Sequence, residues 1–338
     1  VQDPALYRRI LRQGSLGFGE AYMDGLWDSD QLDETLTRLI RVGAGERLPG
    51  LAALHSALAQ VEDLVLNRQS RRRAFHVAHR HYDMLDSSMS YSCGYWRDAQ
   101  TLEEAQRAKL DLICRKLELS PGERLLDIGC GWGGLAEHAA RHYGVSVLGI
   151  TISREQLRLA EERCRGLPVE LRLLDYREVQ GRFDKVVSVG MFEHVGPKNY
   201  RDYFSTVARV LADQGLMLLH TIGSNLSQRG TDPWVQRYIF PNGALPSIRQ
   251  LGAAIEPGLV LEDWHCFGLD YDRTLRAWWQ RFDAAWPTLK GDRYDQRFYR
   301  MWQYYLHLFM GYFRSRRGQL WQLVLSKPSR GALYRALR

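Results

Sequence analysis

The stretch RLLDIGCGWGG at 124–134 constrains the fold of this chain more than any other. Its apolar residues before the glycines predict a buried strand. The glycines allow backbone dihedrals that other residues avoid and let a ligand approach the backbone closely. A helix is expected over 135–142 and a second apolar strand over 145–151, so the sequence predicts a βαβ unit with a nucleotide-cofactor loop after its first strand.

Acidic residues around this loop indicate which cofactor it takes. Gly129, Gly131 and Gly134 fit the dinucleotide pattern GxGxxG, but the acid that an NAD site places about 20 residues further on is missing from the second strand. Asp127 instead precedes the first glycine, and Asp175 closes a predicted third strand. The arrangement resembles the S-adenosylmethionine-dependent methyltransferases, which we prefer to a dehydrogenase or to a tight turn without a ligand.

Composition is that of a globular protein, with 45% hydrophobic and 25% charged residues among 338. This length suffices for one large domain and a smaller one. The net charge of +7 suggests an anionic partner, either nucleic acid or a phospholipid surface. No nucleic-acid motif occurs, and we expect no nucleic-acid partner.

Cysteine usage and hydropathy bear on the compartment. The five cysteines are scattered and form no CxxC pair, so neither a disulfide framework nor a zinc site is expected, and a reducing, cytoplasmic setting fits best. No metal ligand set is predicted. The chain has no apolar run of about 20 residues and no signal-peptide pattern, so any membrane contact is expected to be peripheral.

The region 1–67 is predicted to be mostly helical, with glycine-rich breaks at 14–19 and 43–50. Apolar residues of its last helix, over 51–65, recur at three- and four-residue steps. This face fits either a core or dimer contact or a surface that lies on lipid. The basic stretch 68–80 follows, and it is either a solvated face or a binding site for lipid phosphates.

Candidate polar residues follow two predicted strands. Glu193 and His194 lie in the turn after a strand over 183–189, and His220 lies near the carboxyl end of a strand over 215–222. Carboxyl ends of parallel strands are where open α/β sheets bind ligands, so these side chains are expected to converge. The alternatives are a helix cap for Glu193 and a satisfied core histidine for His220.

Aromatic residues are concentrated in three further stretches. The segment 82–96 is either folded over the cofactor pocket or an ordinary aromatic cluster. The irregular segment 224–245 is interpreted as a lid or substrate insert. Aromatic stripes over 278–313 fit either a core or the lining of an acyl-chain pocket, and a last strand is expected over 320–325.

Longer motifs identify a family. In chain order they are GSLGFGEAYMDGLW, YSCGYW, LDIGCGWGGLA, GITISREQ, VSVGMFEHVGPKNY, LLHTIG, DPWVQRYIFPNG, EDWHCFGLDYDRTLRAWWQRF and LWQLVLS. With these motifs the chain resembles the cyclopropane-fatty-acyl-phospholipid synthases over nearly its whole length. One departure is that Asp83 is followed directly by Met84, where the family has a GND-containing segment, which bears on phospholipid entry.

The resemblance implies an α/β fold with a seven-stranded Rossmann-like methyltransferase sheet and helices on both faces. A small all-helical N-terminal domain at 1–67, for lipid binding and dimerisation, would precede a catalytic domain at 68–338. The implied activity transfers the methyl group of S-adenosylmethionine to a cis double bond of an unsaturated phospholipid acyl chain, after which loss of a proton closes a cyclopropane ring. The implied protein is a homodimer, cytoplasmic and peripheral on the inner face of the membrane.

The resemblance also implies site residues. A bound bicarbonate ion, acting as the base, would be held by Cys93, Glu193, His220, Tyr271 and the backbone of Ile222. S-adenosylmethionine would be bound by Tyr91, Ser92, Asp127, Gly129 and Gly131, with Thr151 and Gln156 at the ribose and Asp175 and Tyr176 at the adenine. The alternatives are a fatty-acid or mycolic-acid methyltransferase of the same superfamily and an inactive lipid-binding relative.

Overall fold

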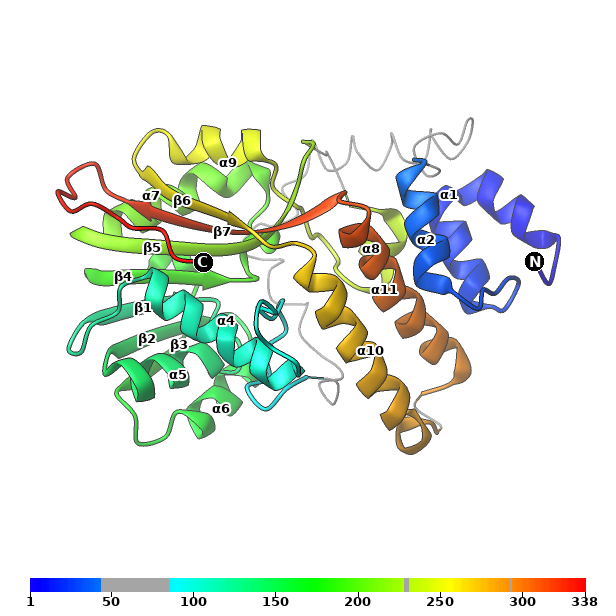
Figure 1. Cartoon of the computed structure of the whole chain (residues 1–338), viewed down its shortest axis with the longest axis horizontal. Helices are drawn as coiled ribbons and strands as arrows, with labels where there is room; N and C mark the ends of the chain where they lie inside the picture. Colours follow the sequence, from blue (N-terminus) through cyan, green and yellow to red (C-terminus); the bar gives the residue numbers. More distant parts are fainter. Residues whose placement is uncertain (44–84, 228–230, 292–293) are drawn as a thin grey trace.

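Seven strands form one sheet in the order β3-β2-β1-β4-β5-β7-β6 (Figure 1). The computed structural model describes residues 1–43, 85–227, 231–291 and 294–338. The strands are β1 (Arg124–Ile128), β2 (Ser146–Thr151), β3 (Val169–Leu173), β4 (Phe183–Val189), β5 (Leu211–Ser224), β6 (Val260–Cys266) and β7 (Gly318–Ser326). The first five are parallel, whereas β7 runs antiparallel to both β5 and β6. The predicted seven-stranded Rossmann-like sheet is confirmed.

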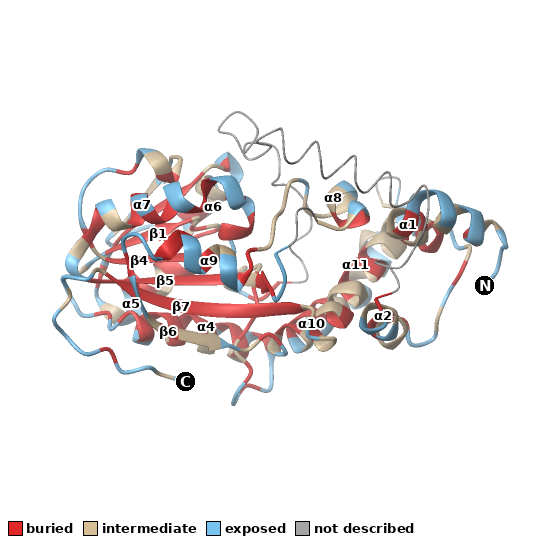
Figure 2. Cartoon of the chain, turned by 90° about the horizontal axis from the view of Figure 1, so that it is seen from above, coloured by how far each residue is buried: buried red, intermediate tan, exposed pale blue. Residues whose placement is uncertain are grey.

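Alternation along the strands gives the sheet two apolar faces. Leu125 and Val147 belong to a core that includes α4 (Leu102–Lys116) and α5 (Gly134–Tyr143). Leu126 and Leu148 belong to a second core on the opposite face, with α7 (Tyr200–Val210) and α9 (Ile248–Ile255). Helix α6 (Arg154–Arg163) follows β2. Figure 2 shows the strands as a buried layer between more exposed helices, as expected for a sheet covered on both faces.

A second, helical body adjoins the sheet (Figure 1). It contains α1 (Ala5–Met23), α2 (Leu32–Arg41), α8 (Pro233–Tyr238), α10 (Asp270–Leu289) and α11 (Gln296–Arg314). These helices share one apolar cluster, which extends from Leu6 of α1 to Phe313 of α11. The N-terminal helices are therefore packed onto the C-terminal pair, and none of the helices in the described ranges is long and apolar enough to cross a bilayer.

Close packing of α2 on α11 depends on a glycine and an arginine. A Cβ atom at Gly311 would lie 2.9 Å from the backbone nitrogen of Thr37, so only glycine permits this approach. Arg314 joins three elements, because its guanidinium lies 3.0 Å from Asp33 of α2 and 2.7 Å from Asp272 of α10. Gly311 thus allows α2 to pack closely on α11, and the ion pairs of Arg314 join α10 to these two helices.

Several predicted elements differ in detail from the structure. The expected break at 14–19 is a kink at Gly14 (φ 58°, ψ −131°) inside a helix that continues to Met23. Strands β5 and β7 are longer than predicted. Strand β6 was not predicted because polar residues interrupt its sequence, VLEDWHC, and among its residues only Asp263 is buried. The segment 224–245 contains the short helix α8, capped by Asp232. The predicted helix over 51–65 and the basic stretch 68–80 lie outside the described residues.

Candidate active site

The glycine loop after β1 requires its glycines for backbone conformation and for space. Gly129, Gly131 and Gly133 have φ angles of +86°, +55° and +78°, in the region that other residues rarely occupy. The backbone nitrogen of Gly129 donates to the carbonyl of Ile150, at 2.9 Å. A Cβ atom at Gly129 would lie 2.7 Å from the side chain of Met191, in the turn after β4. The loop is therefore held against β2 and against that turn.

Asp127 lies at the end of β1, immediately before the loop. It is 2% exposed, and its Oδ2 atom is buried without a hydrogen-bond partner among the residues that the structure describes. Burial raises the pKa of Asp127 to about 7, while the charge of Lys109 acts in the opposite direction. A buried carboxyl group with an unpartnered oxygen would be stabilised in its ionised form by a cationic group of a ligand.

Lys109 is a residue of this site that the sequence interpretation missed. It lies on α4, is 1% exposed, and donates from Nζ to the hydroxyl of Ser92 at 3.0 Å. Burial lowers its pKa to about 8, opposed first by the charge of Asp86. The sequence carried one signal of its burial, since Lys109 follows Ala105 by one helical turn on the apolar face of α4.

The other predicted cofactor residues lie at the ends of β2 and β3 and before α4. Thr151 donates to Oε1 of Gln156 at 2.9 Å, so the structure brings this pair together. Asp175 caps the short turn at Tyr176–Glu178 by accepting from the backbone of Arg177 at 3.0 Å. The buried ring of Tyr176 contacts a neighbouring tyrosine, and its hydroxyl has no hydrogen-bond partner among the residues described.

Tyr91 connects the cofactor side to the helical body. Its hydroxyl lies 2.8 Å from that of Tyr305 on α11, and its ring stacks on Trp278 of α10 with centroids 5.2 Å apart. Phe240 lies near both tyrosine rings, with centroid distances of 6.3 and 5.9 Å. Residues of the segment 91–96 therefore face an aromatic wall built by α10, α11 and the segment after α8.

Glu193 and Ile222 are brought into direct contact. The backbone nitrogen of Ile222 donates to Oε1 of Glu193 at 2.7 Å, and Oε2 of the same carboxyl group is buried without a partner within the described ranges. Burial raises the pKa of Glu193. The neighbouring His194, which was also a candidate, has an exposed side chain. The convergence predicted for the turn after β4 and the end of β5 is therefore observed for Glu193.

His220 lies two residues before Ile222 on β5 and is 1% exposed. Its Nδ1 atom is 3.2 Å from Nε2 of Gln322, whereas its own Nε2 atom is buried and has no partner in the part of the chain that the structure describes. Burial lowers the pKa of His220 well below its usual value, and the charges of Lys109 and Lys116 act in the same direction. The histidine is therefore neutral near pH 7.

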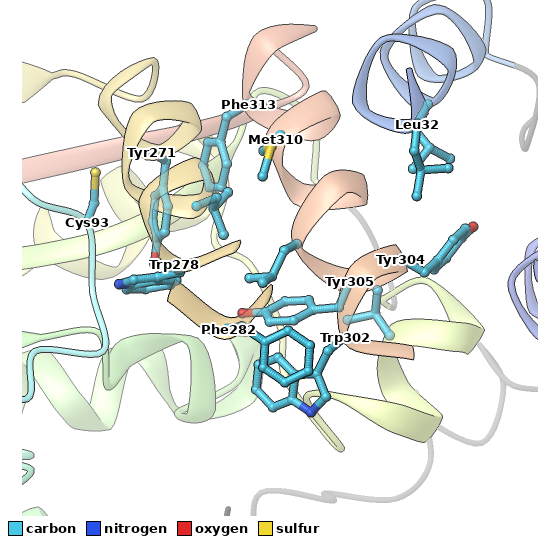
Figure 3. Packing of buried hydrophobic residues seen from close by; sticks show 14 of the residues in the cluster. Leu32, Cys93, Tyr271, Trp278, Phe282, Trp302, Tyr304, Tyr305, Met310 and Phe313 are labelled. Carbon is cyan, nitrogen blue, oxygen red and sulfur yellow. The ribbon is translucent and has the colours of Figure 1, made fainter. Parts of the chain in front are cut away.

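Cys93 and Tyr271 complete the predicted group. The thiol of Cys93 donates to the carbonyl of Gly94 at 3.2 Å, and burial raises its pKa. Tyr271 stacks on Phe313, with centroids 4.3 Å apart. Burial raises the pKa of Tyr271, with the charges of Cys93 and Glu193 as the next causes. Figure 3 shows Cys93 and Tyr271 as neighbours, with Trp278 alongside.

Thr274 of α10 fixes the backbone beside Cys93, and the sequence interpretation missed it. Its hydroxyl accepts from the backbone nitrogen of Gly94 at 3.1 Å and from the indole of Trp96 at 2.8 Å. These partners are nearly 180 residues away in sequence, and no local pattern reveals such a contact. Within the described ranges no group of three or more His, Cys, Asp or Glu side chains could hold a metal ion.

Comparisons with known proteins show the family to which the chain belongs. The family described as mycolic acid cyclopropane synthetase matches residues 66–323. The cyclopropane-fatty-acyl-phospholipid synthase of Escherichia coli strain K12 is 52% identical over 335 residues, covering 97% of this chain and 87% of that protein. The tuberculostearic acid methyltransferase of Mycobacterium tuberculosis is 34% identical over 96% of this chain and 82% of its own length.

A solved structure agrees as well. The crystal structure of a mycolic acid cyclopropane synthase, CmaA1, complexed with SAH and CTAB, aligns with a TM-score of 0.64 and 31% identity, covering 73% of this chain and 96% of that chain. The methyltransferase fold and the enzyme class predicted from the sequence are confirmed. The chain belongs to the mycolic acid cyclopropane synthetase family of S-adenosylmethionine-dependent methyltransferases.

Proposed function

We propose that this chain builds a cyclopropane ring on a cis double bond of an unsaturated acyl chain in a membrane phospholipid. The double bond would attack the methyl carbon of S-adenosylmethionine, and the carbon–sulfur bond would break. The resulting carbocation on the acyl chain would lose one proton from the transferred methyl group, and the electrons of that C–H bond would close the ring. The 52% identity to the Escherichia coli synthase supports this reaction.

One observation carries the proposal. Glu193 accepts from the backbone of Ile222. Two atoms near this contact, Oε2 of Glu193 and Nε2 of His220, are buried without partners among residues 1–43, 85–227, 231–291 and 294–338. Unsatisfied buried polar atoms are costly, so such a pair favours a small polar ligand. Bicarbonate fits, because it offers both a hydrogen-bond donor and acceptor oxygens.

The residues around the glycine loop fit S-adenosylmethionine. Among the described residues, Oδ2 of Asp127 has no partner and suits an ammonium group, and a Cβ at Gly131 would meet nothing within 4 Å, which suits close approach of a ligand. When bound, S-adenosylmethionine would supply an electrophilic methyl group, and bicarbonate would supply the base. We assign the cofactor to Tyr91, Ser92, Asp127, Gly129, Gly131, Thr151, Gln156, Asp175 and Tyr176.

The protein's own contribution would be to hold the anion and to exclude water. We assign the anion to Cys93, Glu193, His220, Tyr271 and the backbone of Ile222. The rings of Tyr91, Trp278 and Tyr305 offer an apolar surface nearby. A carbocation formed beside such rings is protected from hydration and stabilised by their π-faces.

We also propose that the protein acts as a homodimer that contacts the inner face of the membrane peripherally. The net charge of +7 supports attraction to anionic lipid. The basic stretch 68–80 would contribute to this attraction. The division into a lipid-binding, dimerising domain at 1–67 and a catalytic domain at 68–338 is part of the same proposal.

The similarity to the tuberculostearic acid methyltransferase favours one alternative, methylation of a fatty acyl chain without ring closure. Incubation with S-adenosylmethionine, bicarbonate and vesicles of cis-monounsaturated phospholipid, followed by mass spectrometry of the released fatty acids, separates the two. We expect a fatty acid heavier by one methylene that resists hydrogenation. Added mass without a ring would favour the alternative, and no product despite cofactor binding would indicate an inactive lipid-binding relative.

A further inference from the structure

Three polar side chains stand side by side across β5, β7 and β6. In the strand register, Gln322 of β7 lies opposite His220 of β5 on one side and opposite His265 of β6 on the other. Gln322 is fully buried and His220 is 1% exposed, in strands whose interiors are otherwise mainly apolar. Burying a glutamine in such a strand lowers the stability of the protein unless hydrogen bonds compensate for the loss of water around its amide.

The contact between Gln322 and His220 bears on where the imidazole carries its hydrogen. The amide Nε2 of Gln322 lies 3.2 Å from Nδ1 of His220, and Oε1 of Gln322 is buried without a hydrogen-bond partner among the described residues. An amide nitrogen only donates, so in this orientation Nδ1 accepts and a neutral ring carries its hydrogen on Nε2. That Nε2 atom is also buried, with no partner in the described part of the chain.

The surrounding charges keep the ring neutral. Besides burial, Lys109 and Lys116 of α4 and His265 of β6 all lower the pKa of His220. Lys116 is itself fully buried, and its Nζ lies 3.1 Å from both Asp263 and Nδ1 of His265. Glu193, the acidic member of the site, directs Oε1 to the backbone of Ile222 instead.

We propose that Gln322 is a positioning residue, which holds His220 as a neutral imidazole with its hydrogen on Nε2. His220 then donates a hydrogen bond from Nε2 to an oxygen of the bound anion. The identity of that anion rests on the proposed function, whereas the tautomer of His220 does not. A protonated or Nδ1–H imidazole would arise if the partner of Nδ1 were an acceptor.

Nuclear magnetic resonance of the ligand-free protein tests the tautomer directly. With ¹⁵N-labelled histidine, long-range ¹H–¹⁵N spectra distinguish Nε2–H, Nδ1–H and imidazolium forms, and the His220 signals are those lost in His220→Asn. At pH 7 we expect the Nε2–H form in the native protein. In Gln322→Glu the proton should move to Nδ1, because the carboxylate accepts there. Finding Nδ1–H or imidazolium in the native protein would overturn the proposal.

Kinetics test the consequence. Gln322→Glu should lower kcat by roughly 10–100-fold, with little change in KM for phospholipid vesicles. Gln319→Glu is the matched control, since Gln319 lies on the same strand but accepts from Cys266 and donates to the carbonyl of Arg316. An equal loss in both variants, or none in Gln322→Glu, would contradict the assignment.

Two further results distinguish a failure of the Gln322 assignment from a folding defect and from a failure of the proposed function. Gln322→Met removes the donor without burying a charge, so it replaces Gln322→Glu in the kinetics if that variant does not fold, and kcat should again fall with KM preserved. If the native protein shows the Nε2–H tautomer but forms no cyclopropane, the proposed function fails while the assignment of Gln322 stands.

Discussion

Burial makes the carboxyl group of Glu193 unlike one in water. One oxygen accepts from the backbone of Ile222 at 2.7 Å, and the other is buried with no partner among the described residues. Desolvation raises its pKa, which eases the approach of an anion to the same place. The residue therefore combines a structural contact with a free acceptor.

Glu193→Gln separates these two properties. The amide keeps an oxygen for the nitrogen of Ile222 but replaces the other acceptor with a donor. We expect turnover to fall on the order of 10²-fold, with affinity for S-adenosylhomocysteine nearly unchanged by calorimetry. Glu162→Gln, at an exposed ion pair on α6, is the control and should alter neither. Unchanged turnover in Glu193→Gln would remove this residue from the site.

Asp127 makes cofactor binding depend on pH. Its pKa is raised from 3.8 to about 7 in the folded, ligand-free protein, and the ionised form is the one that an ammonium group stabilises. Affinity for S-adenosylhomocysteine should therefore rise about tenfold between pH 6 and pH 8, with release of a proton on binding. Asp127→Asn should lose this part of the dependence, and an identical pH profile in both proteins would contradict the role.

The raised pKa of Asp127 affects the stability of the ligand-free protein in the opposite direction: as the pH rises, cofactor affinity rises but folding stability falls. The folded chain keeps a proton that the unfolded chain releases near pH 3.8. The contribution of Asp127 to stability is thus fully present below pH 3.8 and is lost as the pH rises through about 7. A cationic ligand group bound beside Asp127 would stabilise the ionised carboxylate and so offset this loss of stability.

At the scale of elements, the glycine loop is fixed by conformation and by its neighbour in the turn after β4. Gly129→Ala introduces a Cβ with φ of +86° and a 2.7 Å contact with Met191. We expect a loss of about 1 kcal/mol in stability from the dihedral alone and a clear loss of affinity for S-adenosylhomocysteine.

Gly122→Ala provides the control for that substitution. Gly122 has a φ of +87°, but a Cβ there would meet nothing within 4 Å, and it precedes β1 at the other end of the strand. Urea unfolding should show a similar conformational cost, while cofactor affinity stays unchanged. Equal affinity in both variants would show that the contact with Met191 is unimportant.

The junction between α2 and α11 can be tested in the same way. Gly311→Ala should destabilise the protein by roughly 1–3 kcal/mol, because its Cβ meets the backbone of Thr37 at 2.9 Å. Gly252→Ala, in α9 with open space around it, should stabilise by up to about 1 kcal/mol. Urea unfolding midpoints measure both, and stabilisation by Gly311→Ala would contradict the close approach of the helices.

At the scale of the whole molecule, the sequence predicted those strands that have a clear local pattern of apolar residues. Apolar runs located β1, β2, β4, β5 and β7, because strands that are buried on both faces are continuously apolar. β6 was missed because polar residues interrupt its sequence and most of its residues are not buried, as fits its place at the end of the strand order. The turn after β4, which contains Glu193, and the end of β5 could be placed together, since they lie at the carboxyl ends of neighbouring parallel strands, whereas Ile222 itself was implied only by the resemblance.

Contacts between distant segments could not be read from the sequence. Gln322 meets His220 across 102 residues, and Thr274 meets Gly94 across 180. Such pairs depend on the order of the strands in the sheet and on the packing of α10, and both are properties of the tertiary structure. The packing of α1 and α2 on α11 is of the same kind, because their apolar faces alone do not specify a partner.

Methyl-deuterated S-adenosylmethionine tests the central claim, ring formation on phospholipid, most directly. The protein is incubated with this cofactor, bicarbonate and vesicles of cis-monounsaturated phospholipid, and the deuterium in the released fatty acid is counted by mass spectrometry. Ring closure removes one hydrogen of the transferred methyl group, so we predict a product that keeps two of its three deuterium atoms and resists hydrogenation. A product that keeps all three and contains no ring would contradict the account.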